Sequence, residues 1–524
     1  MLDGVRVLIF HGYLLSGTGS NVYNASLARA LRALGHDVHL ICQERSAQRL
    51  DFVDAVGNWD TGELAVDPTD APGVTGSLTV YAPDIGGLLP VYVRDRYEGF
   101  QVKEFPELSD AEIGAYIERN VTATREVAAR AGGFEVALAN HLVMAPVILA
   151  RAGLEFAIKV HSSDLSYTIL PNLDRFRPYA AEGARAATGI LVGSDHIAQR
   201  LRQAIDEPEI NAKVQLGPPG VDTGVFAPLD AGQAAPRLRA LAATLNPVER
   251  PGVPGKRVTA GRSPRDADSW ERDTGESATA LTWFADAEGP RVVFVGKLIV
   301  SKGVDLLLAA WPLVHASNPG ARLLIAGFGG YRDALQDLWK GLSQGDEQIV
   351  RRIAEQGRGL EGGDTAPLRH LTAFLANAPD VYASASAGSA ESVMFAGRLE
   401  HEEVGGLVPA TDALVFPSTF PEAFGMVAAE AAAAGVLPVS AGHSGALEVS
   451  QALAAQLPGE AAGLVSFPVD DNAVSAIADR LSRWLDLPEA TREASRQALR
   501  ETAIRLWSWD RVADSVIAAS TGGG

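Results

Sequence analysis

The 524-residue sequence contains one cysteine, Cys42, and no apolar run long enough to cross a membrane. One cysteine excludes an intramolecular disulfide and a cysteine-rich metal site, and it is typical of the reducing cytoplasm, where we expect this protein. A spanning helix needs about 20 mostly apolar residues. The longest weakly polar stretch, residues 424–441, is interrupted by Glu430, Gly435 and Pro438. We therefore expect no integral membrane segment, and peripheral association with a membrane stays open.

Positive charge is also scarce, since 45 lysines and arginines stand against 64 aspartates and glutamates, a formal net charge of −19. Such a surface repels nucleic acid, so we expect no nucleic-acid partner. A local pocket for a phosphate is not excluded. Hydrophobic residues make up 47% of the chain and charged residues 21%, which is typical of a globular protein with more than one core.

The first half alternates between apolar runs and helical spacing. The apolar run 5–10 is followed by a small-residue loop, a helical pattern over 22–34 and a second apolar run at 38–42. Strand, glycine loop, helix and strand form the unit of a parallel sheet. The same pattern restarts at residue 291. We therefore predict an α/β protein with two Rossmann-like domains, residues 1–227 and 291–504, and a C-terminal helix over about 505–520 that packs back on the first domain.

Three stretches interrupt this pattern. Residues 228–290 are rich in proline, glycine and mixed charge, which predicts an insertion or linker that is partly flexible. Residues 343–397 are polar and rich in alanine, serine and glycine, which predicts a second insertion containing helices. The irregular stretch 54–107 predicts an excursion with a hairpin formed by 78–81 and 91–93.

Two lysines, Lys297 and Lys302, lie between a buried strand and a helix and are flanked by Gly296 and Gly303. The N–H groups at a helix N-terminus favour an anion, and two ammonium groups supply the charge that a diphosphate needs. On its own this pattern fits equally well a strand-to-helix turn with two solvated lysines.

Two glutamates follow later, Glu422 in a loop before a helix and Glu430 on that helix. A carboxylate accepts hydrogen bonds from the vicinal hydroxyls of a sugar or ribose, and Gly425 lets the backbone approach a ligand closely. Taken alone, the pair is better explained as a helix cap and a surface residue.

Together these residues resemble the retaining glycosyltransferases of family 4, which have the GT-B architecture of two facing Rossmann-like domains with a donor and acceptor cleft between them. The resemblance is most specific in the second half and rests on the diphosphate clamp Gly296, Lys297, Lys302 and Gly303 and on the block Pro417, Ser418, Glu422, Phe424, Gly425, Glu430, Ala431, Gly435, Pro438 and Val439. In the first half it is looser and rests on Gly17-Thr18-Gly19, Asn140-His141, Val160–Asp164 and Pro219–Asp222, and Trp509 resembles a closing Ser-Trp motif. Three positions depart from the family: Lys297 replaces an arginine, Ser162 a glycine and Pro219 an asparagine.

The resemblance implies an enzyme that moves a sugar from a nucleotide-diphosphate sugar, with a UDP-sugar favoured, to an acceptor with retention of anomeric configuration. It implies no cofactor and no metal. The acceptor, a small molecule, a glycan or a lipid, stays open. Lys297, Lys302, Glu422 and His141 would be catalytic. The donor-binding residues would be Gly17, Thr18, Gly19, Gly296, Lys297, Lys302, Gly327, Phe328, Glu422, Phe424, Gly425, Met426, Val427 and Glu430, and His161 and Asp164 would lie on the acceptor side.

Other functions stay open on the same scaffold. A nucleotide-sugar epimerase is one and a hydrolase is another, although eight residues along a helix separate Glu422 and Glu430 by roughly 12 Å, more than the 5–9.5 Å of glycosidase carboxyl pairs. A non-catalytic sugar-nucleotide-binding subunit is the third. The presence of both lysines and both glutamates argues against it, because a scaffold need not keep a diphosphate clamp.

Overall fold

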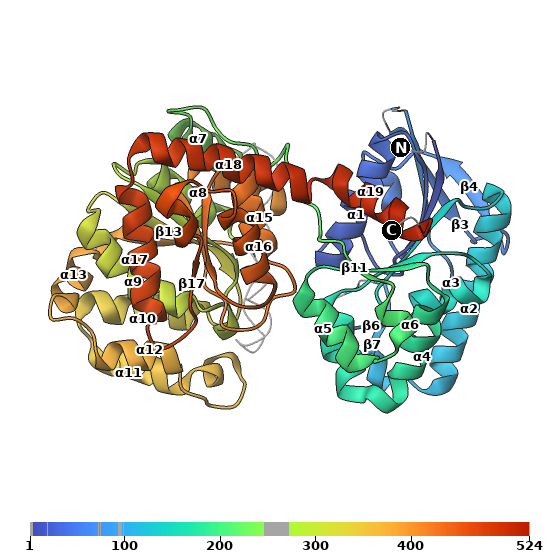
Figure 1. Cartoon of the computed structure of the whole chain (residues 1–524), viewed down its shortest axis with the longest axis horizontal. Coiled ribbons are helices and arrows are strands. Elements are labelled where there is room, and N and C mark those ends of the chain that lie inside the picture. The colour runs from blue at the N-terminus through green and yellow to red at the C-terminus, as the bar shows by residue number, and fades with distance from the viewer. Residues whose placement is uncertain are drawn as a thin grey trace, which may run out of the picture. The chain divides into compact units, whose positions relative to one another are not determined.

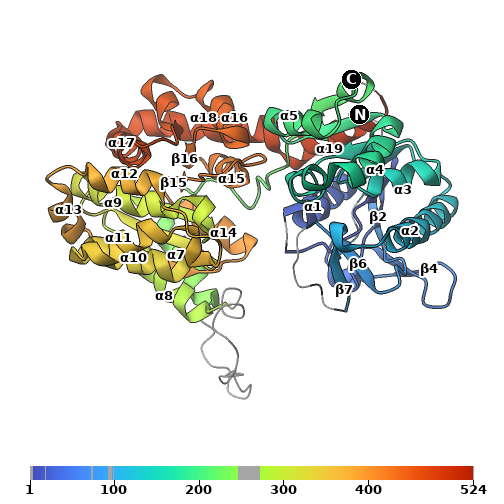
Figure 2. The ribbon, with the colours of Figure 1, turned by 90° about the horizontal axis from the view of Figure 1, so that it is seen from below.

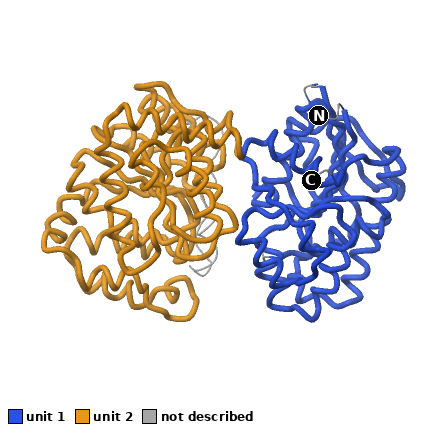
Figure 3. The backbone as a smooth tube through the Cα atoms, in the orientation of Figure 1, with its two compact units in different colours: residues 1–220, 507–524 blue, residues 221–506 orange. Residues whose placement is uncertain are grey.

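The structure is a computed structural model that describes residues 4–17, 19–71, 73, 75–92, 97, 99–245 and 272–522. The chain divides into two compact units (Figure 3): unit 1 is residues 1–220 with 507–524, and unit 2 is residues 221–506. Each unit is built on a sheet that is parallel or nearly so, with helices packed against it (Figures 1 and 2). The predicted α/β class with two parallel-sheet units is confirmed.

Nine strands form the main sheet of unit 1. In sheet order they are β11 (Val214–Leu216), β10 (Gly189–Val192), β9 (Ala157–Lys159), β8 (Val136–Asn140), β1 (Arg6–Phe10), β2 (Asp37–Ile41), β5 (Ser77–Tyr81), β3 (Ala55–Asn58) and β4 (Ala65–Pro68). Every pairing is parallel except that of β3 with β4. The carboxyl ends of the strands therefore share one edge of the sheet, where an open parallel sheet binds its ligands.

Helices cover both faces of this sheet (Figure 1). They are α1 (Gly19–Ala33), α2 (Asp110–Ala131), α3 (Ala145–Ala152), α4 (Leu173–Ala186), α5 (Asp195–Ala204), α6 (Pro208–Asn211) and α19 (Trp509–Ser520). Alternate residues of β1, Val7 and Ile9, share one buried cluster with Leu27 of α1 and Val516 of α19. The last helix of the described chain thus completes the core of the unit that contains its beginning.

The predicted hairpin between 78–81 and 91–93 is wrong. β5 lies parallel to β2 in the main sheet, and β6 (Leu88–Val91) pairs in parallel with β7 (Gln101–Glu104) in a separate two-stranded sheet. Residue 93 lies outside the described residues. The apolar runs correctly indicated strands, but the pairing of a parallel strand is set by residues distant in the sequence, which a local pattern does not reveal.

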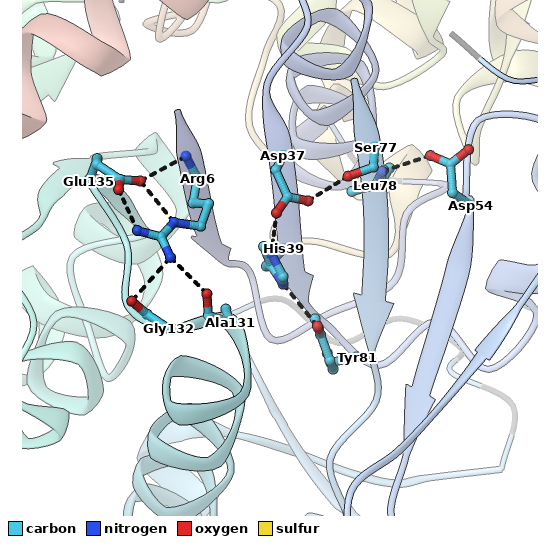
Figure 4. Close-up of polar contacts among 10 residues, drawn as sticks. All are labelled: Arg6, Asp37, His39, Asp54, Ser77, Leu78, Tyr81, Ala131, Gly132 and Glu135. Atoms are coloured by element: carbon cyan, nitrogen blue, oxygen red, sulfur yellow. Dashed lines mark hydrogen bonds and ion pairs between the residues drawn. The ribbon is translucent and has the colours of Figure 1, made fainter. Parts of the chain in front are cut away.

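The amino ends of the central strands are tied together by charged side chains (Figure 4). Arg6, the first residue of β1, pairs with Glu135 at 2.6 Å and donates to the Ala131 and Gly132 carbonyls that end α2. Asp37, the first residue of β2, accepts a 2.5 Å hydrogen bond from Ser77 of β5. Because these contacts lie at the edge opposite the carboxyl ends, we assign them to stability and not to ligand binding.

Unit 2 contains a six-stranded parallel sheet. In sheet order its strands are β14 (Val393–Gly397), β13 (Arg322–Phe328), β12 (Arg291–Lys297), β15 (Ala413–Phe416), β16 (Leu437–Ala441) and β17 (Ser466–Phe467). Counted along the chain, this order is 3-2-1-4-5-6, that of the dinucleotide-binding fold. The direction of winding reverses between β12 and β15, so the crevice for a ligand is expected at their carboxyl ends.

The helices of unit 2 pack around this sheet (Figure 2). They are α7 (Ala234–Leu245), α8 (Thr274–Ala285), α9 (Val304–Ser317), α10 (Arg332–Gln344), α11 (Glu347–Gln356), α12 (Arg369–Ala376), α13 (Tyr382–Gly388), α14 (His401–Leu407), α15 (Met426–Ala433), α16 (Ser444–Ala454), α17 (Ala473–Asp486) and α18 (Glu489–Trp507). Across the described ranges, no helix has the length and apolar character needed to span a bilayer.

The insertion or linker predicted over 228–290 contains two packed helices where the structure describes it. There α7 and α8 pack against each other, and α8 also packs against β14. Leu238, Leu281 and Phe284 are fully buried in this packing. The charged and turn-forming residues around them obscured their helical spacing in the sequence. Residues 246–271 lie outside the described residues.

The predicted insertion over 343–397 contains the expected helices, α11, α12 and α13. Its last five residues, however, are β14, which pairs with β13 as the edge strand of the sheet. The insertion therefore ends before Val393. This strand has a short apolar run, residues 393–396, but it follows a stretch rich in alanine, serine and glycine that was assigned as a whole to the insertion.

Val516→Asp is expected to destabilise unit 1 by about 3 kcal/mol or more, because it buries an unpaired carboxylate in the cluster shared by β1, α1 and α19. Ser515→Asp, on the partly exposed side of the same helix, is the matched control and should have little effect. Thermal unfolding of the whole chain measures both, and equal melting temperatures would contradict the assignment of α19 to this core.

Candidate active site

The carboxyl ends of β12 and β13 carry glycines where the two strands meet. Gly296 and Gly327 are opposite each other in the register, as are Lys297 and Phe328. A Cβ atom on Gly327 would overlap the Gly296 carbonyl oxygen, so no larger residue fits there. The close approach of these strands brings the exposed Lys297 to the edge of the sheet beside the β12–β15 reversal.

Lys302 and Glu422 form an ion pair at this reversal. Lys302 ends a short 3₁₀ turn after β12, and the left-handed Gly303, with φ of 64°, leads into α9. The Lys302 Nζ donates to the Glu422 Oε1 at 2.5 Å and lies 5.4 Å from the centre of the Phe416 ring. The two side chains are 23% and 21% exposed, so the pair is partly screened from water yet accessible to a ligand.

Glu422 is held at both ends. Its carboxylate accepts a 2.6 Å hydrogen bond from the Ser418 hydroxyl, and its backbone N–H donates to the Ser444 Oγ at 2.8 Å. The His443 Nε2 donates to the Ser418 carbonyl oxygen at 2.9 Å, because a carbonyl oxygen can only accept. Sequence reasoning assigned no role to His443 or Ser444, because their proximity to Glu422 arises from the packing of α16 and not from spacing.

The residues between the two glutamates start α15. Phe424 is buried, Gly425 has φ of 118°, and Met426 and Val427 are the first residues of the helix. The first N–H groups of a helix lack partners within the helix and favour an anion or a polar ligand. The predicted donor-binding backbone of 424–427 therefore lies beside Glu422.

Glu430 has a different environment from Glu422. It is only 7% exposed, and burial raises its pKa to about 8. The His401 Nδ1 lies 3.9 Å from the Glu430 Oε1, and burial lowers the pKa of His401. At neutral pH both groups are mostly uncharged, so they do not form an ion pair. A protonated carboxyl both donates and accepts hydrogen bonds, which fits a pair of hydroxyls.

In unit 1 the predicted glycine loop precedes α1. Gly17 has φ of 94°, and Gly19 is the first residue of the helix. A Cβ atom on either glycine would contact nothing, so the loop has open space on that side. Thr18 lies outside the described residues.

His141 follows β8 in a strained conformation, with φ of 73°. Its ring is 1% exposed and is surrounded by Tyr92, His161 and Tyr13, whose ring centres lie 4.3, 4.7 and 5.7 Å away. Among the described residues neither ring nitrogen has a hydrogen-bond partner, although Nδ1 lies 3.6 Å from the Asp164 Oδ2. Buried polar groups without partners and left-handed non-glycine residues are uncommon and often mark functional sites.

His161 and Asp164, predicted on the acceptor side, lie next to His141. The His161 Nε2 donates to the Asn140 Oδ1 at 2.7 Å, and Asn140 donates to the His11 Nδ1 at 2.8 Å. Burial lowers the pKa of His161 well below its usual value and that of His11 to about 3, so both rings are neutral. Asp164 accepts from the Leu142 N–H at 2.8 Å.

Two buried groups of this cluster were missed in the sequence. His11 directly follows β1, as His141 follows β8. Its position at the carboxyl end of a strand could have identified it as a candidate site residue. Lys159 ends β9 and donates to the Gly217 carbonyl, and burial lowers its pKa to about 7. No local pattern distinguished Lys159 from a surface lysine. In the part of the chain that the structure describes, no cluster of three or more His, Cys, Asp or Glu side chains is placed to hold a metal ion.

Comparison with known proteins shows which family models unit 2 is similar to. Residues 289–356 and 381–503, both in unit 2, match family models described as glycosyl transferases group 1. These matches support the group 1 glycosyltransferase superfamily for unit 2, and they include the two lysines and the two glutamates.

Curated relatives match over part of their length. The chain is 29% identical to a glycogen synthase of Mycobacterium tuberculosis over 239 residues, 45% of this chain and 44% of that protein. It is 28% identical to a GDP-mannose-dependent phosphatidylinositol monomannoside mannosyltransferase of Corynebacterium glutamicum over 265 residues, 49% of this chain and 51% of that protein. The chain thus spans about half the length of the curated relatives it matches.

Solved structures are similar over nearly the whole chain. The HepE protein of Anabaena, in complex with UDP and glucose, superposes with a TM-score of 0.54 at 14% identity, covering 98% of each chain. The catalytic domain of starch synthase IV from Arabidopsis thaliana superposes with a TM-score of 0.53 at 13% identity, covering 99% of this chain and 100% of that one. These similarities confirm the GT-B fold.

Glu430→Gln is expected to stabilise the protein increasingly as the pH rises from about 4.5 to 8. Over this range the unfolded chain releases the Glu430 proton while the folded protein retains it, so the wild type loses stability with rising pH and the variant does not. The difference should level off above pH 8. Thermal unfolding at pH 5, 7 and 9 measures it, with the exposed Glu355→Gln as control. A difference independent of pH would contradict the burial of an uncharged carboxyl.

Proposed function

We propose that this protein is a retaining glycosyltransferase that moves a sugar from a nucleotide-diphosphate sugar, with a UDP-sugar favoured, to an acceptor, without a metal ion or a cofactor. The observation that carries the proposal is the Lys302–Glu422 ion pair at the reversal of the unit 2 sheet, within segments that match the group 1 glycosyltransferases. The similarity to HepE, which was solved with UDP and glucose, supports a UDP-sugar.

The chemistry requires charge stabilisation more than a strong base. When the bond between the anomeric carbon and the diphosphate breaks, negative charge grows on the leaving group and the sugar gains oxocarbenium character. Preorganised cations at the leaving group are then the main catalytic device. In this proposal Lys297 and Lys302 neutralise the diphosphate, with N–H groups of the glycine loop at 17–19.

The remaining residues orient the donor and acceptor. Glu422 and the backbone of 424–427 hold the transferred sugar, and Glu430 binds the ribose hydroxyls. His141, whose ring nitrogens have no partner in the described chain, orients the sugar, and His161 and Asp164 lie on the acceptor side. The acceptor hydroxyl attacks the face from which the diphosphate leaves and passes its proton to the departing phosphate, which gives retention. The acceptor is a small molecule, a glycan or a lipid, and the enzyme acts in the cytoplasm.

A screen over UDP-, GDP- and ADP-sugars tests the proposal directly. A transferase should hydrolyse one of these donors slowly without an acceptor and rapidly transfer the sugar when the acceptor is supplied. Interconversion of two sugars without an acceptor would indicate an epimerase. Binding without any turnover, with or without acceptors, would indicate a non-catalytic subunit.

Lys302→Ala is expected to lower the transfer rate about 10²–10³-fold, the loss seen when one donor to a developing oxyanion is removed. The exposed Lys340→Ala on α10 is the matched control and should keep the wild-type rate. Rates are measured with the best donor of the screen, and thermal unfolding checks that both variants fold. More than about a tenth of the wild-type rate in Lys302→Ala would contradict a diphosphate role.

Transfer is expected to retain the anomeric configuration of the donor and to proceed at full rate in excess EDTA. The reason is that lysines, and not a divalent cation, are proposed to neutralise the leaving diphosphate. NMR of the first product formed gives the configuration, and assays with and without EDTA give the metal dependence. An inverted product, or activity restored only by Mg²⁺ or Mn²⁺, would refute this mechanism.

A further inference from the structure

Ser444, the first residue of α16, has a backbone conformation that favours glycine. Its φ is 52°, and the other described non-glycine residues with positive φ are His141 and Met144, at the candidate site of unit 1. A side chain in this region costs conformational energy, which persists only where the surroundings enforce it. The next residue, Gly445, is pressed against the loop after Glu422, since a Cβ atom on it would lie 2.6 Å from the Ala423 carbonyl oxygen.

The Ser444 hydroxyl connects this strained turn to Glu422. It accepts from the Glu422 N–H at 2.8 Å and donates to the His443 carbonyl at 2.7 Å. The His443 ring contacts both serines that hold Glu422, with Nδ1 at 3.1 Å from the Ser444 Oγ and Nε2 at 2.9 Å from the Ser418 carbonyl oxygen. The backbone and the carboxylate of Glu422 are therefore fixed through one connected set of hydrogen bonds.

We infer that Ser444 is a positioning residue for Glu422, and that its hydroxyl is the reason a serine occupies a turn suited to glycine. Glycine would adopt this φ without strain but would leave the Glu422 N–H without its acceptor. The Ser444 hydroxyl fixes the backbone of Glu422, while Ser418 and Lys302 fix its carboxylate. Displacement of a positioned group by a fraction of an ångström is enough to slow a reaction.

This inference rests on the proposed function and makes it more specific. Ser444 acts through Glu422 on the transferred sugar and not on the nucleotide. Loss of the hydroxyl should therefore impair binding and turnover of a nucleotide sugar while leaving the nucleotide diphosphate unaffected.

Two substitutions separate the hydroxyl from the strain. Ser444→Ala removes the hydroxyl and keeps a Cβ atom at positive φ, whereas Ser444→Gly removes both. We expect each to lower kcat for sugar release by about ten-fold, with UDP affinity within two-fold of wild type by calorimetry. We also expect Ser444→Gly to melt at a higher temperature than Ser444→Ala. The exposed Ser384→Ala on α13 is the control and should match the wild type throughout.

The probes are UDP, UDP-glucose, GDP-mannose and ADP-glucose, with UDP replaced by the matching diphosphate if another donor is cleaved best. Equal losses of kcat in two variants of different melting temperature would support the proposal. Wild-type kcat in Ser444→Gly, or kcat values that follow the melting temperatures, would overturn it, as would parallel losses of nucleotide and nucleotide-sugar affinity. A wild-type protein that binds and cleaves none of the probes would instead refute the proposed function and this inference with it.

Discussion

The Lys302–Glu422 ion pair joins the two halves of the unit 2 sheet at the point where the winding reverses. Lys302 follows β12 and Glu422 follows β15, so these two residues, 120 positions apart in the chain, meet only because the two strands are neighbours in the sheet. The close approach of the two loops requires a glycine at position 303, because a Cβ atom on Gly303 would overlap the Pro417 carbonyl oxygen. The strand order therefore places the Lys302 ammonium and the Glu422 carboxylate at one edge of the sheet. The loops after β12 and β15 set the distance between the two groups.

The energetics of this pair are consistent with a role in binding. A partly exposed ion pair adds about 0–1 kcal/mol to stability, too little to explain the serines, the histidine and the strained turn that support it. Its value lies in preorganisation, since a lysine already fixed beside a carboxylate needs little reorganisation when a charged ligand arrives. Glu430, eight residues further along the chain, has no such partner among the described residues, and burial raises its pKa to about 8.

The sequence predicted the strands and the motif residues well, because buried parallel strands leave continuous apolar runs and the loops after them have distinctive composition. The α/β class, the restart of the pattern at 291, and the positions of Lys302 and Glu422 after their strands follow from such local signals. Local signals did not predict the pairing of β5 with β2. They also did not predict the packing of α7 against α8 or the edge strand β14. Partner choice depends on residues far away in the chain. For the same reason Ser444 and His443 were not recognised, since their contacts arise from the packing of α16 against a loop that precedes it by two elements.

The position of α19 has a consequence for how this chain is synthesised. Val512, Ala513, Val516 and Ala519 of α19 are buried in the core of unit 1, whose other described elements precede residue 221. A nascent chain emerges from the ribosome in sequence order, and domains generally fold as they appear. Unit 1 therefore cannot complete its core until all of unit 2 has been translated. Until then, the apolar surface that α19 covers stays exposed to water. Molecular chaperones bind such surfaces, and residues 1–220 expressed alone would keep this surface exposed.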